Sequence, residues 1–259
     1  IQRTMETKQV IRVIPFILIT ACGLLTSCSG GGMTLGEIDK LSPSERSVIQ
    51  ELKITDIKGD GELNLTETLQ GFRSLKKLEI AKSFTGTLMG GACHGQIPHL
   101  ETLIAKGVTI IGWEMFNGSS EIKNVELPNA SELMNHAFNG DQNNIESLDF
   151  PNLRVIGGYA FEGCRNLKVL KLGSSESIAC YAGVFGTRNE VHTEQVDLYL
   201  GKYEYTHNVE GNQWITHSKP NQNMISFDNT ATTGKVDIHS SGAEGEVTGI
   251  LVFKNIYPY

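Results

Sequence analysis

The chain has 259 residues, a formal net charge of -7 at pH 7, and hydrophobic residues at 39% of its positions. No basic patch interleaved with aromatic residues occurs in it, and a negative surface repels phosphate backbones, so nucleic acid is excluded as an expected partner. The five cysteines show neither C-x-x-C spacing nor a dense pattern, which disfavours a zinc ribbon or a small disulfide scaffold.

The first segment has the pattern of an export signal. Basic Arg3, Lys8 and Arg12 precede an uncharged stretch over residues 13–25. This stretch is shorter than the roughly 20 apolar residues that a transmembrane helix needs. We therefore expect residues 1–27 to be a lipoprotein signal peptide, with an ordinary signal peptide, or a buried amphipathic helix with an incidental cysteine, as the alternatives.

The expected cleavage point is marked by Leu25–Cys28, which resembles the lipobox of bacterial lipoproteins. The resemblance implies that Cys28 carries a diacylglycerol and that the mature protein is anchored in a lipid bilayer. The expected location is the outer membrane or cell surface of a Gram-negative bacterium, and an anchor that faces the periplasm stays open. Cleavage removes three basic residues and Glu6, so the net charge moves from -7 to -9.

Residues 28–35 contain three consecutive glycines and are expected to form a flexible tether. Residues 36–70 are expected to form an N-terminal cap. In this cap Ser42–Glu45 has the sequence of a capping box with proline at the first helical position. The apolar Val48, Ile49 and Leu52 are expected to follow on one face of that helix.

A second feature of the cap resembles a calcium loop. Asp56, Asp60 and Glu67 nearly fit the pattern D-x-[DN]-x-[DN]-G-x5-E, but Lys58 occupies the third position, where an oxygen ligand is required. The favoured interpretation is an entry turn into the following repeats. The sequence therefore predicts no metal and no cofactor, with these three acidic residues as a weak calcium candidate.

The main body is repetitive over residues 71–200. Five segments follow one pattern of apolar residues, and their first residues lie 25, 22, 23 and 22 positions apart, which is the period of leucine-rich repeats. A sixth, less regular copy follows. The segments are Leu75–Ile80, Leu100–Ala105, Ile122–Leu127, Ile145–Phe150, Leu167–Leu172 and Val196–Leu200.

A second pattern lies between these segments, with an aromatic residue every 22, 23 and 24 positions, at Phe116, Phe138, Phe161 and Phe185. The pairing of Ile-Gly-x-x-Ala-Phe-x-Gly-Cys with Leu-x-x-Leu-x-Leu-Pro resembles the BspA-like leucine-rich repeats of bacterial surface lipoproteins. The resemblance covers about Leu75–Leu200 and is less regular over Ser83–Gln96. It implies a module that binds host proteins or other bacteria.

These patterns together predict one leucine-rich repeat domain over residues 36–259. The expected fold is a β-rich solenoid in which short parallel strands stack into one sheet, with equivalent leucines and phenylalanines in one interior column. Residues 201–259 are expected to form an irregular C-terminal β cap that ends in a closing strand over Val247–Phe253. Cys93, Cys164 and Cys180 are expected to be buried thiols, and one disulfide stays possible.

The expected binding surface is the outward face of the strands, because alternate residues of a strand point to opposite sides. It forms a mixed ribbon with an acidic middle, suited to protein or glycan contact. An ordinary solvated sheet face is the alternative. The candidate binding residues are Lys77, Glu79, Ile104, Asn124, Glu126, Asp149, Lys171 and Tyr199.

The sequence favours a membrane-anchored, adhesin-like binding module that is not an enzyme. The alternative is a hydrolase with its site in the irregular residues 201–246, where Asp228, His207, His217 and His239 could converge. No G-x-S-x-G or H-E-x-x-H motif supports this alternative.

Overall fold

The computed structural model describes residues 32–91, 96–117, 121–140, 144–173 and 195–200, and the backbone of further strands between residues 179 and 258. Met33–Tyr259 form one compact unit. The predicted signal peptide and Cys28 lie outside the described residues. Among the described helices, none combines the length and the apolar character needed to cross a membrane.

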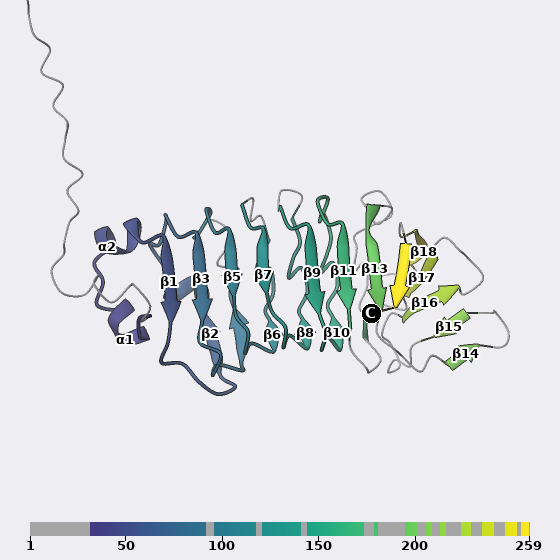
Figure 1. The fold of residues 1–259 in the computed structure, drawn as a ribbon, viewed down its shortest axis with the longest axis horizontal. Helices are drawn as coiled ribbons and strands as arrows, with labels where there is room; N and C mark the ends of the chain where they lie inside the picture. Colours follow the sequence, from purple (N-terminus) through teal and green to yellow (C-terminus); the bar gives the residue numbers. More distant parts are fainter. Residues whose placement is uncertain are drawn as a thin grey trace, which may run out of the picture. The chain divides into compact units, whose positions relative to one another are not determined.

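Two short helices precede the first strand, at the N-terminal end of the solenoid (Figure 1). α2, Pro43–Val48, has the predicted capping box: Ser42 Oγ accepts a hydrogen bond from the N–H of Glu45, and Glu45 Oε2 accepts one from the N–H of Ser42. α1, Leu35–Ile38, has a second box formed by Thr34 and Glu37, which the sequence analysis missed. Each N-cap residue thus satisfies backbone donors that a helix start leaves without a partner.

These hydrogen bonds also lower the pKa of both carboxyl groups. For Glu45 the main cause is the Ser42 hydroxyl, and for Glu37 it is the backbone N–H of Thr34. The predicted apolar face behind α2 is wrong, because the helix ends at Val48, whose side chain is 67% exposed. Leu52 instead points inward from the first strand.

The repeat structure begins before residue 71. Met33, in the predicted tether, is buried and forms a parallel bridge with Ile54. The first coil follows within the predicted cap, and its strands β1 (Glu51–Ile54) and β2 (Glu62–Asn64) each pair in parallel with a strand of the next coil.

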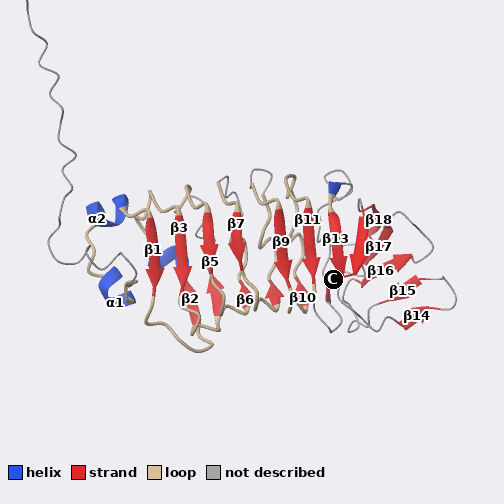
Figure 2. Cartoon of the chain, in the orientation of Figure 1, coloured by secondary structure: helices blue, strands red, loops and turns tan. Residues whose placement is uncertain are grey.

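The predicted parallel ladder is confirmed, and its strands form two four-stranded sheets in place of one. The first sheet consists of β1, β3 (Lys77–Ile80), β5 (Thr102–Ile104) and β7 (Asn124–Glu126). The second consists of β9 (Ser147–Phe150), β11 (Val169–Leu172), β13 (Asp197–Leu200) and β19 (Asn255–Pro258). Figure 2 shows both sets of strands in one row.

The Ile-Gly segments form a second parallel ladder that the sequence analysis did not predict as strands. Its six members are β2, β4 (Thr87–Met89), β6 (Ile110–Ile111), β8 (Glu132–Leu133), β10 (Val155–Ile156) and β12 (Ala179–Cys180). Leu88 pairs with Ile111, so the irregular Ser83–Gln96 unit is in register through Leu88 and not through Phe84. α3, Leu65–Thr68, follows β2 and is capped by Asn64.

The core is a column of apolar side chains between the two ladders. The rings of Phe116 and Phe138 stack with centroids 4.7 Å apart, and those of Phe138 and Phe161 lie 6.0 Å apart. Phe116 and Phe138 are fully buried and Phe161 nearly so, which confirms the predicted interior column. Cys164 is also buried, and its thiol donates to the carbonyl of Phe138.

The C-terminal region contains a five-stranded antiparallel sheet. Its strands are β14 (Thr206–Asn208), β15 (Gln213–Ile215), β16 (Met224–Asp228), β17 (Lys235–Ser240) and β18 (Val247–Val252). The predicted strand over Val247–Phe253 therefore exists, but it pairs with β17 and does not close the solenoid. The strand that continues the parallel ladder is β19, which pairs with β13.

Candidate functional site

The structure places the predicted binding residues on the outward positions of six strands, β3, β5, β7, β9, β11 and β13. Leu78, Leu103, Leu148 and Leu170 point inward, and the residues on either side of each are partly or fully exposed. The pairing register aligns Glu79 with Ile104 and Glu126 in the first sheet, and Asp149 with Lys171 and Tyr199 in the second. The predicted ribbon therefore consists of two separate halves, and Ile104 is not contiguous with Tyr199.

Most charges on this face are paired with the neighbouring strand. Lys53 Nζ lies 2.6 Å from Glu79, and Lys171 Nζ lies 3.7 Å from Asp149 and 5.6 Å from the ring centre of Tyr199. Such exposed pairs contribute little to stability, because water screens them. They do neutralise the expected acidic middle of the face, so charge alone does not single out a binding region.

A further row of ion pairs lies just before the strands. Glu101 lies between Lys76, at 3.7 Å, and Lys123, at 3.1 Å, and the hydrogen bond from Lys123 is the main cause that lowers the pKa of Glu101. Lys168 lies 2.8 Å from Glu146 in the same row. These contacts link successive coils along the edge.

The most distinctive feature of the face is a groove between β7 and β9, with a volume of about 680 Å³. Figure 1 shows these two strands further apart than the other neighbours in the row. The volume lies within the roughly 300–1,000 Å³ of typical ligand sites. The groove is lined by Thr102, Lys123, Asn124, Val125, Glu126, Asn144, Glu146, Ser147 and Asn166.

The groove arises from an interruption of the backbone ladder. At most steps, one carbonyl accepts hydrogen bonds from two consecutive N–H groups of the next coil, as Glu101 does from Lys123 and Asn124, and Glu146 from Lys168 and Val169. Within the described residues, no N–H donates to the carbonyl of Lys123 in this way. Asn144 instead donates to Ile122, at 3.0 Å.

The spacing of the sequence also differs at this step. The interior aromatic residue and the central strand residue are 9, 10 and 9 positions apart in three successive coils. The pairs are Phe116 to Val125, Phe138 to Leu148, and Phe161 to Leu170. The coil that ends in β9 has one extra residue before its strand, at the step where the ladder is interrupted.

The groove combines neutral polar groups with charges that are already paired. Lys123, Glu126 and Glu146 each contact a partner outside the lining, respectively Glu101, Lys106 and Lys168. Glu126 is also the main cause that raises the pKa of Lys106. The remaining polar groups of the lining are amides and hydroxyls, which both donate and accept hydrogen bonds. The groove is therefore suited to an uncharged polar ligand.

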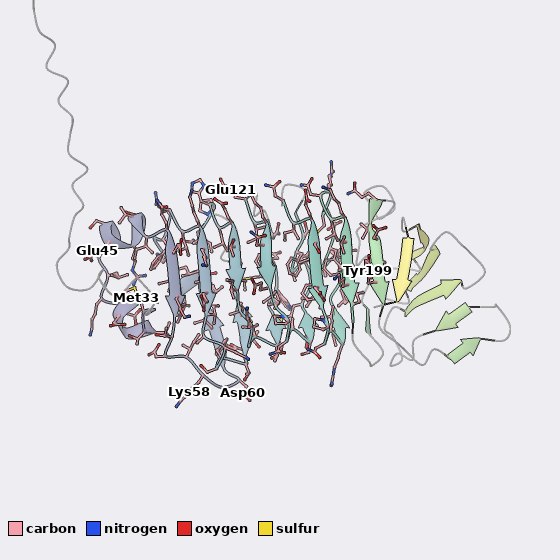
Figure 3. All side chains as sticks on the ribbon, in the orientation of Figure 1. Met33, Glu45, Lys58, Asp60, Glu121 and Tyr199 are labelled. Carbon is pink, nitrogen blue, oxygen red and sulfur yellow. The ribbon has the colours of Figure 1, made fainter. Side chains whose placement is uncertain are left out.

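Of the predicted binding residues, the groove brings together Asn124 and Glu126. Lys77, Glu79 and Ile104 lie on the first sheet outside the lining, and the remaining three lie on the second sheet. Tyr199, labelled in Figure 3, lies on β13 and is not part of the lining. Sequence reasoning missed Lys123, Asn144, Glu146 and Asn166, which precede the strands and do not follow the alternation.

The weak calcium candidates do not form a site in the described part of the chain, where no group of three or more His, Cys, Asp or Glu residues could hold a metal ion. Asp56 Oδ1 accepts a hydrogen bond from the N–H of Leu35, so this carboxylate supports the start of α1. Lys58 and Asp60 lie at the outer margin of their loop (Figure 3). The flanking elements are strands β1 and β2, and an EF-hand would require helices.

The hydrolase alternative rests on residues whose side chains lie outside the described parts. The backbone places His207 on β14, Asp228 on β16 and His239 on β17, and His217 lies outside the described residues. The structure therefore adds no geometric support for a catalytic group in this region.

Comparison with known families identifies the repeats. Residues 89–187 match the BspA type leucine rich repeat region in six copies. No curated protein matches the chain. The matched range covers the coils that form the groove, and leucine-rich repeats of this kind serve as interaction modules.

Proposed function

We propose, from the BspA-type leucine-rich repeats over residues 89–187, that the chain binds a ligand on the outward face of its strands and does not catalyse a reaction. The observation that carries this proposal is the groove between β7 and β9. It is the position where the regular face opens, and its lining offers amides, hydroxyls and backbone groups in a small space.

We further propose that the module is displayed on a membrane through an acylated Cys28. The lipobox-like Leu25–Cys28 and the glycine-rich residues that follow it support this proposal. A tethered, non-catalytic module of this kind suits an adhesin-like role toward host or bacterial surface proteins or glycans. The expected location is the outer membrane or the cell surface.

The test is to incubate the full chain, solubilised in mild detergent, with peptide and glycan libraries and to record both binding and release of products. We expect binding without turnover. The Asn124→Arg variant should weaken binding on the order of tenfold or more, because the long cationic side chain fills the groove.

The matched control is Glu51→Arg, which places the same side chain at the equivalent register position of β1, outside the groove. It should bind like the unmodified chain. Equal weakening by both variants, or release of a product that scales with protein concentration, would contradict the proposal.

A further inference from the structure

Two strand edges face each other across the groove. β7 is the last strand of the first four-stranded sheet, and β9 is the end strand of the second. Strand edges of this kind present backbone N–H and C=O groups that are ready to pair with another chain. In this chain, the edges of β7 and β9 belong to one solenoid and face the same groove.

The register shows which backbone groups face the groove. The N–H of Asn124 donates to Glu101, and the carbonyl of Glu126 accepts from Ala105, so both residues use their backbone toward β5. Since consecutive residues of a parallel strand face opposite sides, the N–H and C=O of Val125 face β9. The carbonyl of Glu146 accepts from the N–H of Val169 on β11. By the same alternation, the backbone N–H and C=O of Ser147, one residue later, face β7.

The length of the open region is limited at both ends. Asn144 donates to the carbonyl of Ile122 at one end, and the side chain of Asn152 donates to the carbonyl of Pro128 at the other. Residues 123–127 lie between these contacts on the β7 side. At about 3.3 Å per residue, the open region has room for roughly four to five residues of extended chain.

We infer that this groove holds a short extended segment of a partner protein, whose backbone pairs with Val125 on one wall and with Ser147 on the other. This inference rests on the proposed function and names its ligand class. The backbone groups of a peptide match two facing strand edges, in the manner of strand addition to a sheet edge. Because the charges of the lining are paired elsewhere, recognition depends on the peptide backbone more than on side-chain charge.

The test uses an array of random linear peptides of about seven residues, which exceed the open length. The bound peptides are then resynthesised with N-methyl groups on alternate residues, which removes half of their N–H donors. We expect N-methylation to weaken binding at least about tenfold for each of the two alternating patterns, because successive N–H groups of the peptide face opposite walls. This comparison leaves the protein unchanged.

The protein-side test compares Ser147→Pro with Ser147→Ala in the full chain. Proline removes the N–H that faces the groove and is tolerated at the first residue of a strand, which is the position of Ser147 in β9. Alanine keeps that N–H and removes only the hydroxyl. We expect Ser147→Pro to lose peptide binding at least about tenfold and Ser147→Ala to retain it.

Three results would overturn the inference: binding of glycans but no peptide, peptide binding that is indifferent to N-methylation, or equal loss with alanine and proline at residue 147. A different outcome is that Asn124→Arg weakens binding and Ser147→Pro leaves binding unchanged. This outcome would overturn the inference and leave the proposed function intact.

Discussion

Replacing Phe138 with alanine is expected to lower the free energy of unfolding by about 3–5 kcal/mol. The ring is fully buried and stacks between Phe116 and Phe161 of the adjacent coils, and it also packs against Phe150 at 5.8 Å. In a stacked repeat, stability depends on interfaces between neighbours, so this one change weakens the contacts on both sides. Chemical denaturation followed by circular dichroism measures the loss.

The matched control for this experiment is Trp113→Ala. Trp113 is also a large aromatic residue of the repeat region, but its side chain is 65% exposed. Its removal should change the free energy of unfolding by less than about 0.5 kcal/mol. A Phe138→Ala protein that unfolds at the same denaturant concentration as the unmodified chain would show that the aromatic column does not stabilise the stack.

Replacing Gly157 with alanine is expected to destabilise the solenoid by about 3 kcal/mol, at the upper end of overpacking effects. A Cβ atom at this position would lie 2.4 Å from the backbone nitrogen of Asn135 and 2.4 Å from the carbonyl carbon of Met134. Both atoms belong to the backbone of the preceding coil, so the clash can be relieved only by moving the two coils apart. The same denaturation experiment measures this effect.

Gly61→Ala provides the control for Gly157. A Cβ atom at Gly61 would have nothing within 4 Å. This change should leave stability unchanged or raise it by up to about 1 kcal/mol, because alanine reduces the freedom of the unfolded chain. Similar stability for both alanine variants would contradict the close contact between coils that the structure shows.

The strands of the first ladder could be predicted because the same pattern of apolar residues is repeated in each of them. Leu78, Leu103, Val125, Leu148, Leu170 and Leu198 recur 22 to 28 positions apart, and the leucines occupy equivalent inward positions. A wrong register would expose all of them, so the pattern strongly determines the pairing. The capping box at Ser42–Glu45 could be predicted for a similar reason, because its residue types directly satisfy the donors of the helix start.

The second ladder could not be predicted in the same way. β6, β8 and β10 have two residues each, which is too short to show the alternation that identifies a strand. Gly112 and Gly157, which follow β6 and β10, permit the close approach of neighbouring coils. The helix α1 was missed because its capping residues, Thr34 and Glu37, lie at the end of the presumed tether and the start of the cap.

The candidate site was predicted only in part. The alternation of apolar and polar residues along each strand identified the outward positions, including Asn124 and Glu126. This alternation is the same in every coil, so it does not distinguish one coil from another. The groove lies at the coil that has one extra residue between Phe138 and Leu148, and the sequence shows this residue only when distances within each coil are compared. The open pairing between β7 and β9 is a property of neighbouring coils in space, so a periodic pattern alone does not reveal it.

The ladder is open between β7 and β9, and amide hydrogen exchange of the full chain tests this opening most directly. The N–H of Val125 faces the groove, whereas those of Leu103 and Leu170 occupy the equivalent register positions and face paired strands. We expect Val125 to exchange at least about tenfold faster than both leucines, because among the described residues no strand pairs with β7 on the side that its N–H faces. Protection of Val125 equal to that of Leu103 and Leu170 would mean that the ladder is closed at this step, which would contradict the account.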